Sequence, residues 1–196
     1  MRSYVPALYL ASKSVRRQEL LSAMKLPFHS VPSSYREHRR RKIPPEALCV
    51  RHAVGKVRKA VLPRAARFVL GGDTIVWHHN QVFGKPKTRA EALRMLRSLA
   101  GRKHAVYTGL ALWDRKMGSM LTGCAKTEVW MKPASEKWLR KYIDIIHPFD
   151  KAGSYAIQAR LKIVRKIQGS YSNVVGLPKE LLRKMLKEMV QKSDAL

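Results

Sequence analysis

The chain has 196 residues, 45% of them hydrophobic, and its 40 basic and 13 acidic residues give a formal net charge of +27. The hydrophobic share is ordinary for a globular protein and excludes disorder of the whole chain. The sequence contains no apolar run near the roughly 18–20 residues of a membrane span, and residues 1–10 lack the features of a signal peptide. We therefore expect a cytoplasmic protein whose charge attracts phosphate-bearing partners.

Strand and helix patterns alternate along the chain, which predicts a mixed α/β fold. We expect Gly71 and Gly72 to interrupt one strand pattern, where they allow a bulky group to approach the backbone. We expect Val61 on the apolar stripe of a helix that Pro63 closes. The predicted strands are residues 4–10, 68–70, 75–77, 104–113, 122–131 and 161–167, and the predicted helices are residues 15–24, 45–62, 88–100, 135–145 and 179–191.

Several helix ends have recognisable signals. Ser14 is a predicted N-cap, and Pro45 is tolerated in the first turn of the second helix. Thr88 and Glu91 have the spacing of a capping box, and Gly101 has the position of a C-cap. These signals predict where three of the helices begin and where one of them ends.

Two arginines, Arg16 and Arg17, stand in the first turn of the first predicted helix. Cations at that end oppose the helix dipole, so local helix stability does not explain them. A bound anion at the helix start would explain them. The two cysteines, Cys49 and Cys124, lack the spacing of a zinc site, and we expect reduced core thiols.

Four short clusters combine glycine, basic residues and aspartate, at residues 12–17, 72–74, 84–86 and 150–153. Each is weak alone, and the sequence has neither a P-loop nor a G-x-G-x-x-G motif. In their order, however, they closely resemble the Maf family. The matching motifs are LASxSxRRxELL at 10–21, GDTIV at 72–76, GKP at 84–86, GxxHxVxTG at 101–109, DKAGxYxIQ at 150–158 and SYSNVVGLP at 170–178.

This resemblance implies an α/β fold with a mixed, elongated central sheet flanked by helices, in which two lobes enclose a nucleotide cleft. It implies a single domain over residues 1–196 that hydrolyses nucleoside triphosphates to the monophosphate and pyrophosphate with a divalent metal, Mg²⁺ or Mn²⁺. The Arg16-Arg17, Asp73-Thr74 and Ile157-Gln158 pairs resemble the branch that acts on dTTP and UTP, and modified pyrimidine nucleotides stay open as substrates. A homodimer is a further family-level expectation.

The phosphate chain of such a substrate needs cationic partners, because its charge must be neutralised before water attacks phosphorus. We expect Arg16, Lys56 and Lys85 to hold the phosphates, the arginine by forking two oxygens and the lysines as point charges. The start of the first helix, including Ser12, offers free N–H groups for the same purpose.

Asp73 is the candidate general base, because acids are scarce in this chain and this one follows two glycines. With Glu37 it is also the candidate metal ligand, since hard cations prefer carboxylate oxygens. By resemblance, Arg16, Thr74 and Gln158 would select the base, and the last two can hydrogen-bond the edge of a pyrimidine.

The chain departs from the family in three places. Of an acidic pair in the family, the segment Ser34-Tyr35-Arg36-Glu37 retains only Glu37. Gly55 replaces the acid before Lys56, and His147-Pro148 replaces an acid-Pro pair. These losses predict a weaker metal site or a different metal preference.

The excess positive charge leaves alternatives open. The run from Arg36 to Lys42, with the basic helix faces, would suit nucleic-acid binding. A solvated surface is the favoured interpretation, because aromatic residues are not interleaved with that run. A non-catalytic regulator of cell division is a third reading, against which the retention of Asp73, Lys56 and Lys85 argues.

Overall fold

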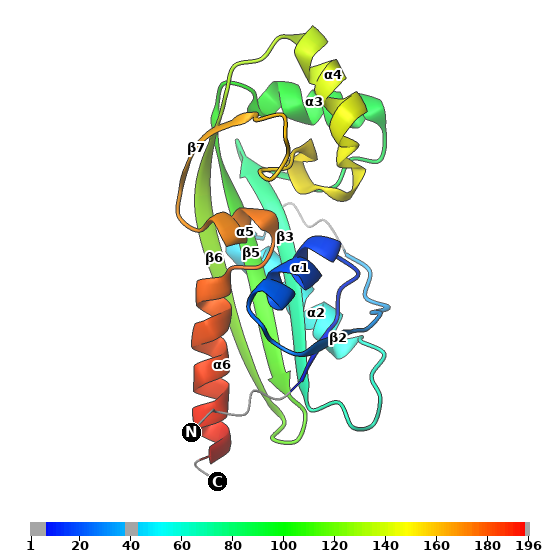
Figure 1. Ribbon diagram of the computed structural model, residues 1–196, viewed down its shortest axis with the longest axis vertical. Helices are drawn as coiled ribbons and strands as arrows, with labels where there is room; N and C mark the ends of the chain where they lie inside the picture. Colours follow the sequence, from blue (N-terminus) through cyan, green and yellow to red (C-terminus); the bar gives the residue numbers. More distant parts are fainter. Residues whose placement is uncertain (1–6, 38–42, 195–196) are drawn as a thin grey trace.

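A mixed sheet runs through the length of the molecule (Figure 1). The computed structural model describes residues 7–37 and 43–194. The described strands have the order β2-β1-β3-β5-β6-β7, with β4 paired to β3; β1 is parallel to β2 and β3, and the other pairs are antiparallel. They are β1 (Leu8–Leu10), β2 (Phe28–Ser30), β3 (Phe68–His78), β4 (Gln81–Phe83), β5 (Lys103–Asp114), β6 (Ser119–Met131) and β7 (Val164–Gln168).

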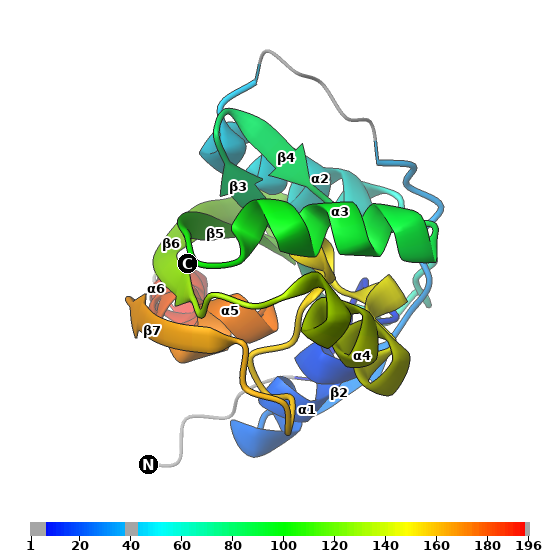
Figure 2. The ribbon, with the colours of Figure 1, turned by 90° about the horizontal axis from the view of Figure 1, so that it is seen from above.

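Helices cover both faces of this sheet, with α2 on one face and α1 and α6 on the other (Figures 1 and 2). Among the described helices, none is both long and apolar enough to cross a membrane. They are α1 (Val15–Ala23), α2 (Pro45–Arg58), α3 (Arg89–Leu99), α4 (Glu136–Ile146), α5 (Tyr171–Val175) and α6 (Lys179–Asp194), with short 3-10 turns at Pro148–Asp150 and Ala152–Ser154.

Separate apolar clusters divide the molecule into two lobes that share the long strands. In one lobe, α3 and α4 pack on the ends of β3, β5 and β6 around Val76, Val106 and Val129. In the other, α1 and α6 pack around Leu10, Leu70 and Leu110. The expected mixed α/β fold with two lobes is therefore observed, because each amphipathic helix buries its apolar stripe on the same continuous sheet.

Glycines let α2 lie unusually close to the sheet. A Cβ atom on Gly71 would lie 2.5 Å from the carbonyl oxygen of Ala53, and one on Gly109 would overlap the backbone of Cys49. The bulky group that was expected to approach the backbone at Gly71 and Gly72 is therefore helix α2. The predicted interruption of the strand at these glycines is not observed, because β3 is continuous from Phe68 to His78. The same packing brings Sγ of Cys49 to 3.4 Å from Sγ of Cys124 on β6, both as free thiols.

An open stretch of strand edge lies in the middle of β3. On that edge, β1 pairs with Phe68–Leu70 and β4 pairs with Val76–His78. In the described part of the chain, no strand pairs with residues 71–75 on the same edge. Asp73 and Thr74 therefore lie where backbone and side chains can meet a ligand instead of a neighbouring strand.

The helix ends follow the sequence signals in part. Thr88 Oγ1 accepts a hydrogen bond from the Glu91 amide at 3.1 Å, and Gly101 follows α3 with φ of 71°, both as predicted. Ser14 is the N-cap residue of α1, but its side chain makes no capping hydrogen bond.

The prediction that Pro63 closes α2 is wrong. The helix ends at Arg58, and Val61 is 63% exposed instead of facing the core. The reason is tertiary: the Val61 amide donates to the carbonyl of Pro32 at 2.9 Å, and the Ser34 amide donates to that of Lys59 at 3.0 Å. These bonds draw the chain out of the helix before the proline is reached.

Candidate functional site

A cavity of about 830 Å³ opens beside the unpaired edge of β3. The start of α1, the middle of α2 and the loops around residues 84–87, 150–158 and 174–176 form its walls. Asp73 and Glu37, the predicted metal ligands, line it. So do all the predicted substrate-binding residues, which are Ser12, Arg16, Lys56, Thr74, Lys85 and Gln158. The fold therefore brings the candidate residues from both halves of the chain to one place, while their roles stay predictions.

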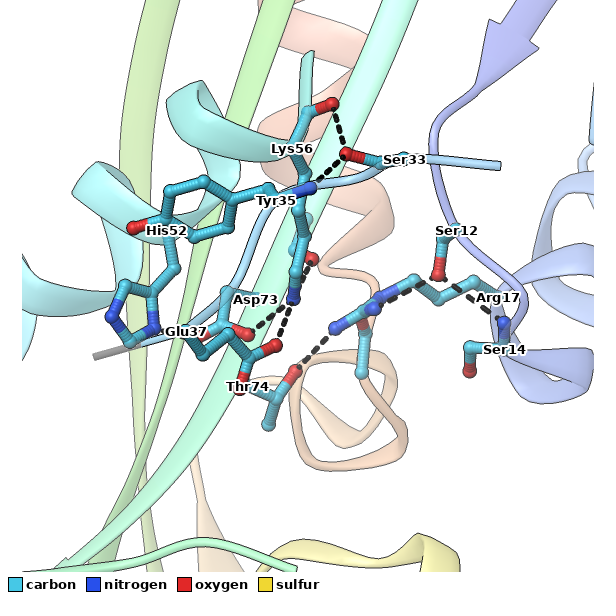
Figure 3. A network of polar contacts seen from close by, with 12 residues as sticks. Ser12, Ser14, Arg17, Ser33, Tyr35, Glu37, His52, Lys56, Asp73 and Thr74 are labelled. Carbon is cyan, nitrogen blue, oxygen red and sulfur yellow. Dashed lines mark hydrogen bonds and ion pairs between the residues drawn. The ribbon is translucent and has the colours of Figure 1, made fainter. Parts of the chain in front are cut away.

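Lys56 and the buried Asp73 lie at the centre of the polar contacts in this cavity (Figure 3). Lys56 Nζ donates to Asp73 Oδ1 at 2.6 Å and to the carbonyl of Gly72 at 3.3 Å, and it lies 2.7 Å from Glu37 Oε1. His52 Nδ1 lies 3.1 Å from Asp73 Oδ2. Because Asp73 is only 5% exposed, these partners replace the water that its carboxylate lacks.

The surroundings of Asp73 keep its carboxylate ionised. Burial by itself would raise the pKa of Asp73, but the hydrogen bonds from His52 and Lys56 and the charges of Lys56 and Arg17 outweigh it and lower the pKa well below 3.8. A general base is most effective with a pKa near the working pH. The carboxylate is therefore ionised in this arrangement, while its role as general base stays a prediction.

Arg17 is the arginine that points inward from the first turn of α1. It is buried, and its guanidinium donates to the carbonyl of Gly176 at 2.8 Å, to Ser12 Oγ at 3.1 Å and to Thr74 Oγ1 at 3.1 Å. Burial lowers the pKa of Arg17. The sequence predicted a bound anion beside both Arg16 and Arg17, whereas the described partners of Arg17 are protein oxygens. The position of Arg17 four residues before the buried Leu21 was the available signal, because residues at that spacing share a helix face.

Arg16 pairs with an acidic residue on the opposite wall of the cavity. Its guanidinium pairs with the Asp150 carboxylate and donates to the Asp150 carbonyl at 3.0 Å, and Lys151 pairs with the same carboxylate. The expected role of Arg16 in holding phosphate stays a prediction. Arg16 links α1 to the loop of the other lobe, across the cavity that both line.

Thr74 has a fixed orientation at the edge of β3. Its hydroxyl lies 3.0 Å from the hydroxyl of Thr108 on β5, which donates to the carbonyl of Asn173 at 3.1 Å. With the hydrogen bond from Arg17, these contacts determine which lone pairs and protons Thr74 presents to the cavity. Gln158 and Ile157 line the same cavity, and Gln158 is exposed.

Three side chains could hold a metal ion together. One ligand atom from each of Glu37, His52 and Asp73 lies within 4.8 Å of the others. His52 was missed from the sequence, although it stands one helical turn before Lys56, on the same face of α2. The residues present therefore fit a divalent cation, with one nitrogen and two carboxylate donors.

Gly55, one of the departures from the family pattern, has a packing reason. A Cβ atom at this position would overlap the ring of Tyr35, which fills the space beside α2. An acid before Lys56 would therefore require this ring to move. The run from Arg36 to Lys42 is described only for Arg36 and Glu37, both exposed, and residues 38–42 lie outside the described residues.

Comparison with known proteins identifies the family of this chain. The family model of Maf-like proteins matches residues 7–189. A dTTP/UTP pyrophosphatase of Geobacter sp. (strain M21) is 42% identical over 173 residues, which cover 88% of this chain and 90% of that protein. A dTTP/UTP pyrophosphatase of Gloeobacter violaceus is 40% identical over 182 residues, which cover 92% of this chain and 95% of that protein. This chain therefore belongs to the Maf family.

Proposed function

We propose that the chain is a nucleoside triphosphate pyrophosphatase that hydrolyses dTTP and UTP to the monophosphate and pyrophosphate. The observation that supports this most directly is the contact of Lys56 with Asp73 at the open edge of β3, inside a cavity lined by further cations. The names of the similar proteins, which cover most of both chains, supply the substrate class.

The cavity suits a triphosphate in size and charge. Its volume of about 830 Å³ falls within the range of small-molecule sites. We infer that Arg16, Lys56 and Lys85 neutralise the phosphates, and that the start of α1 near Ser12 contributes backbone N–H groups. Arg17 is buried, and its guanidinium joins the start of α1 to Thr74 and Gly176, so we assign it to the cavity wall and not to the phosphates.

We assign to Asp73 and Glu37 the binding of a divalent cation, Mg²⁺ or Mn²⁺. Held there, such an ion would neutralise phosphate charge and lower the pKa of a bound water. Asp73 then orients the water for attack on the α phosphorus, and its ionised state allows it to accept a hydrogen bond from that water. Gln158 is the proposed donor and acceptor for the pyrimidine edge, and Thr74, whose proton goes to Thr108, is a proposed acceptor; Arg16 lines the same cavity.

The biological setting forms part of the same proposal. We expect residues 1–196 to act as a single catalytic domain in the cytoplasm, as a homodimer. Light scattering after size-exclusion chromatography tests the dimer, and a monomer at working concentrations would contradict it. Nucleic-acid binding and cell-division regulation are not favoured, because the similar proteins named above are pyrophosphatases.

The test is a nucleotide panel with pyrophosphate detection, run on the wild type and on Asp73→Asn. We expect pyrophosphate from dTTP and UTP well above that from purine nucleotides, and a loss of about 10³-fold in kcat for Asp73→Asn. Asp144→Asn is the control, because Asp144 is an exposed carboxylate that pairs with Arg89 outside the cavity. Full activity in Asp73→Asn, or no pyrophosphate from any nucleotide, would overturn the proposal.

A further inference from the structure

We propose that His52 is a nitrogen ligand of the metal that Asp73 and Glu37 hold, and that the site therefore selects a transition-metal dication such as Mn²⁺ or Co²⁺ over Mg²⁺. The role of this metal in the reaction rests on the proposed function. Binding itself is a property of the three side chains and can be measured without nucleotide.

The separation of the ligand atoms fits one ion. His52 Nδ1 and Asp73 Oδ2 are 3.1 Å apart, and the three ligand atoms, including that of Glu37, lie within 4.8 Å of one another. Two ligands that are each about 2.1 Å from an ion, at right angles, are about 3.0 Å apart. The His52 and Asp73 side chains, 5% and 7% exposed, therefore stand at the spacing of adjacent ligands.

A cation already lies among these carboxylates. Lys56 Nζ is 2.6 Å from Asp73 Oδ1 and 2.7 Å from Glu37 Oε1, so the two acids converge on positive charge (Figure 3). A dication must compete with this ammonium for the same oxygens. An ion that also gains a bond to imidazole nitrogen competes better than one that depends on oxygen alone.

The imidazole of His52 packs against the aromatic ring of Tyr35. Tyr35 lies with its ring centroid 5.9 Å from that of His52, and it occupies the space that any side chain at position 55 would need. The Tyr35 amide donates to Ser33 Oγ at 3.3 Å, and Ser33 Oγ donates to the carbonyl of Lys56 at 2.9 Å. The position of His52 is therefore supported by contacts that do not depend on a metal.

The donor set decides between the dications. Mg²⁺ requires near-ideal octahedral oxygen ligation and loses its water reluctantly. For first-row dications the affinity of a site with nitrogen and oxygen donors rises from Mn²⁺ to Co²⁺, so the gain from the imidazole is expected to be larger for Co²⁺ than for Mn²⁺. One buried nitrogen beside two carboxylates therefore favours Mn²⁺ and Co²⁺, which accept both donor types. Mg²⁺ is expected to bind more weakly.

Pulsed electron paramagnetic resonance of Mn²⁺ added to the full chain tests direct ligation. We expect the low-frequency modulation of a coordinated ¹⁴N nucleus, lost in His52→Gln and kept in His29→Gln. The glutamine can still donate a hydrogen bond to Asp73 but has no ligating nitrogen, and His29 is exposed on β2, away from the cavity. Protein with ¹⁵N-labelled histidine should show the altered frequency without any substitution, which keeps the test valid if a variant fails to fold.

Calorimetric titration of Co²⁺ and Mg²⁺ tests selectivity. We expect His52→Gln to lose about tenfold or more in Co²⁺ affinity and less than about threefold in Mg²⁺ affinity, in line with the loss of one ligand. Equal losses for both metals, or Mn²⁺ with oxygen ligands only, would overturn the inference and make His52 a partner of Asp73 alone. If the inference fails but the protein still releases pyrophosphate with Mg²⁺, the proposed function stands. If His52 ligates the metal but no nucleotide is hydrolysed, only the proposed function is contradicted.

Discussion

Arg17 Nη2 donates a hydrogen bond to Thr74 Oγ1 at 3.1 Å, and this contact joins the first turn of α1 to the open edge of β3. The same guanidinium reaches Ser12 and Gly176, so three separate parts of the chain meet on one buried cation. Its neighbour Arg16 is left to face the cavity. We therefore expect the two adjacent arginines to have different tasks, Arg17 in the cavity wall and Arg16 in binding the ligand.

A matched pair of substitutions separates these tasks. Arg17→Met leaves the acceptors at Ser12, Thr74 and Gly176 without their donor, and we expect a loss of about 2–4 kcal/mol in the free energy of unfolding. Arg16→Met should change that free energy by less than about 0.5 kcal/mol while raising KM for dTTP about tenfold. Chemical denaturation and steady-state kinetics measure both effects, and equal destabilisation by the two variants would refute the division.

The ionisation of Asp73 predicts a dependence of stability on pH. Because the folded pKa of Asp73 lies below its ordinary value of 3.8, the ionised carboxylate stabilises the folded state above about pH 3.8, and this contribution falls as the pH drops toward the folded pKa. The wild type should therefore exceed Asp73→Asn in unfolding free energy most at neutral pH, with a gap that narrows below about pH 4. Urea denaturation from pH 7 to pH 3 measures the gap, and a constant difference would contradict the ion pair.

The close approach of α2 predicts that an added methyl group at Gly109 is harmful. A Cβ atom there would overlap the backbone of Cys49 and Val50, neither of which can move without displacing α2. We expect Gly109→Ala to cost about 1–3 kcal/mol or more in stability and to reduce activity, because α2 holds His52 and Lys56.

Gly123→Ala is the control for this prediction. Its Cβ atom would come within 3.0 Å of Leu181 Cδ1, the end of a side chain that can turn away. Thermal unfolding should show a clearly smaller shift for this variant than for Gly109→Ala. If the two shifts are equal, the approach of α2 is not what requires glycine on the sheet.

The N-cap of α3 predicts a smaller and purely structural effect. Thr88 Oγ1 accepts the hydrogen bond of the Glu91 amide, and Glu91 Oε2 accepts that of the Lys87 amide at 2.8 Å. Thr88→Ala should cost about 1 kcal/mol of unfolding free energy without changing kcat. Thr122→Ala, at an exposed position of β6, provides the comparison and should be nearly neutral.

The sequence by itself determined most of the elements and most of the residues around the cavity. Apolar periodicity and capping signals such as Thr88 with Glu91 are local, so they survive in any fold that keeps the helix. The ordered motifs also identified Asp73, Thr74 and Lys85 as candidates. Each of these motifs consists of a few consecutive residues, so it can be recognised without knowing which distant segments pack against it.

Only the tertiary structure decided which side chains meet. Arg16 and Arg17 are adjacent in sequence, yet one is buried against Thr74 and the other pairs with Asp150, because a rotation of about 100° per residue points them to different surroundings. The end of α2 at Arg58 likewise depends on hydrogen bonds to residues 32–34. His52 became a candidate ligand only when α2 was seen to pack on β3, since a contact between distant segments has no local signature in the chain.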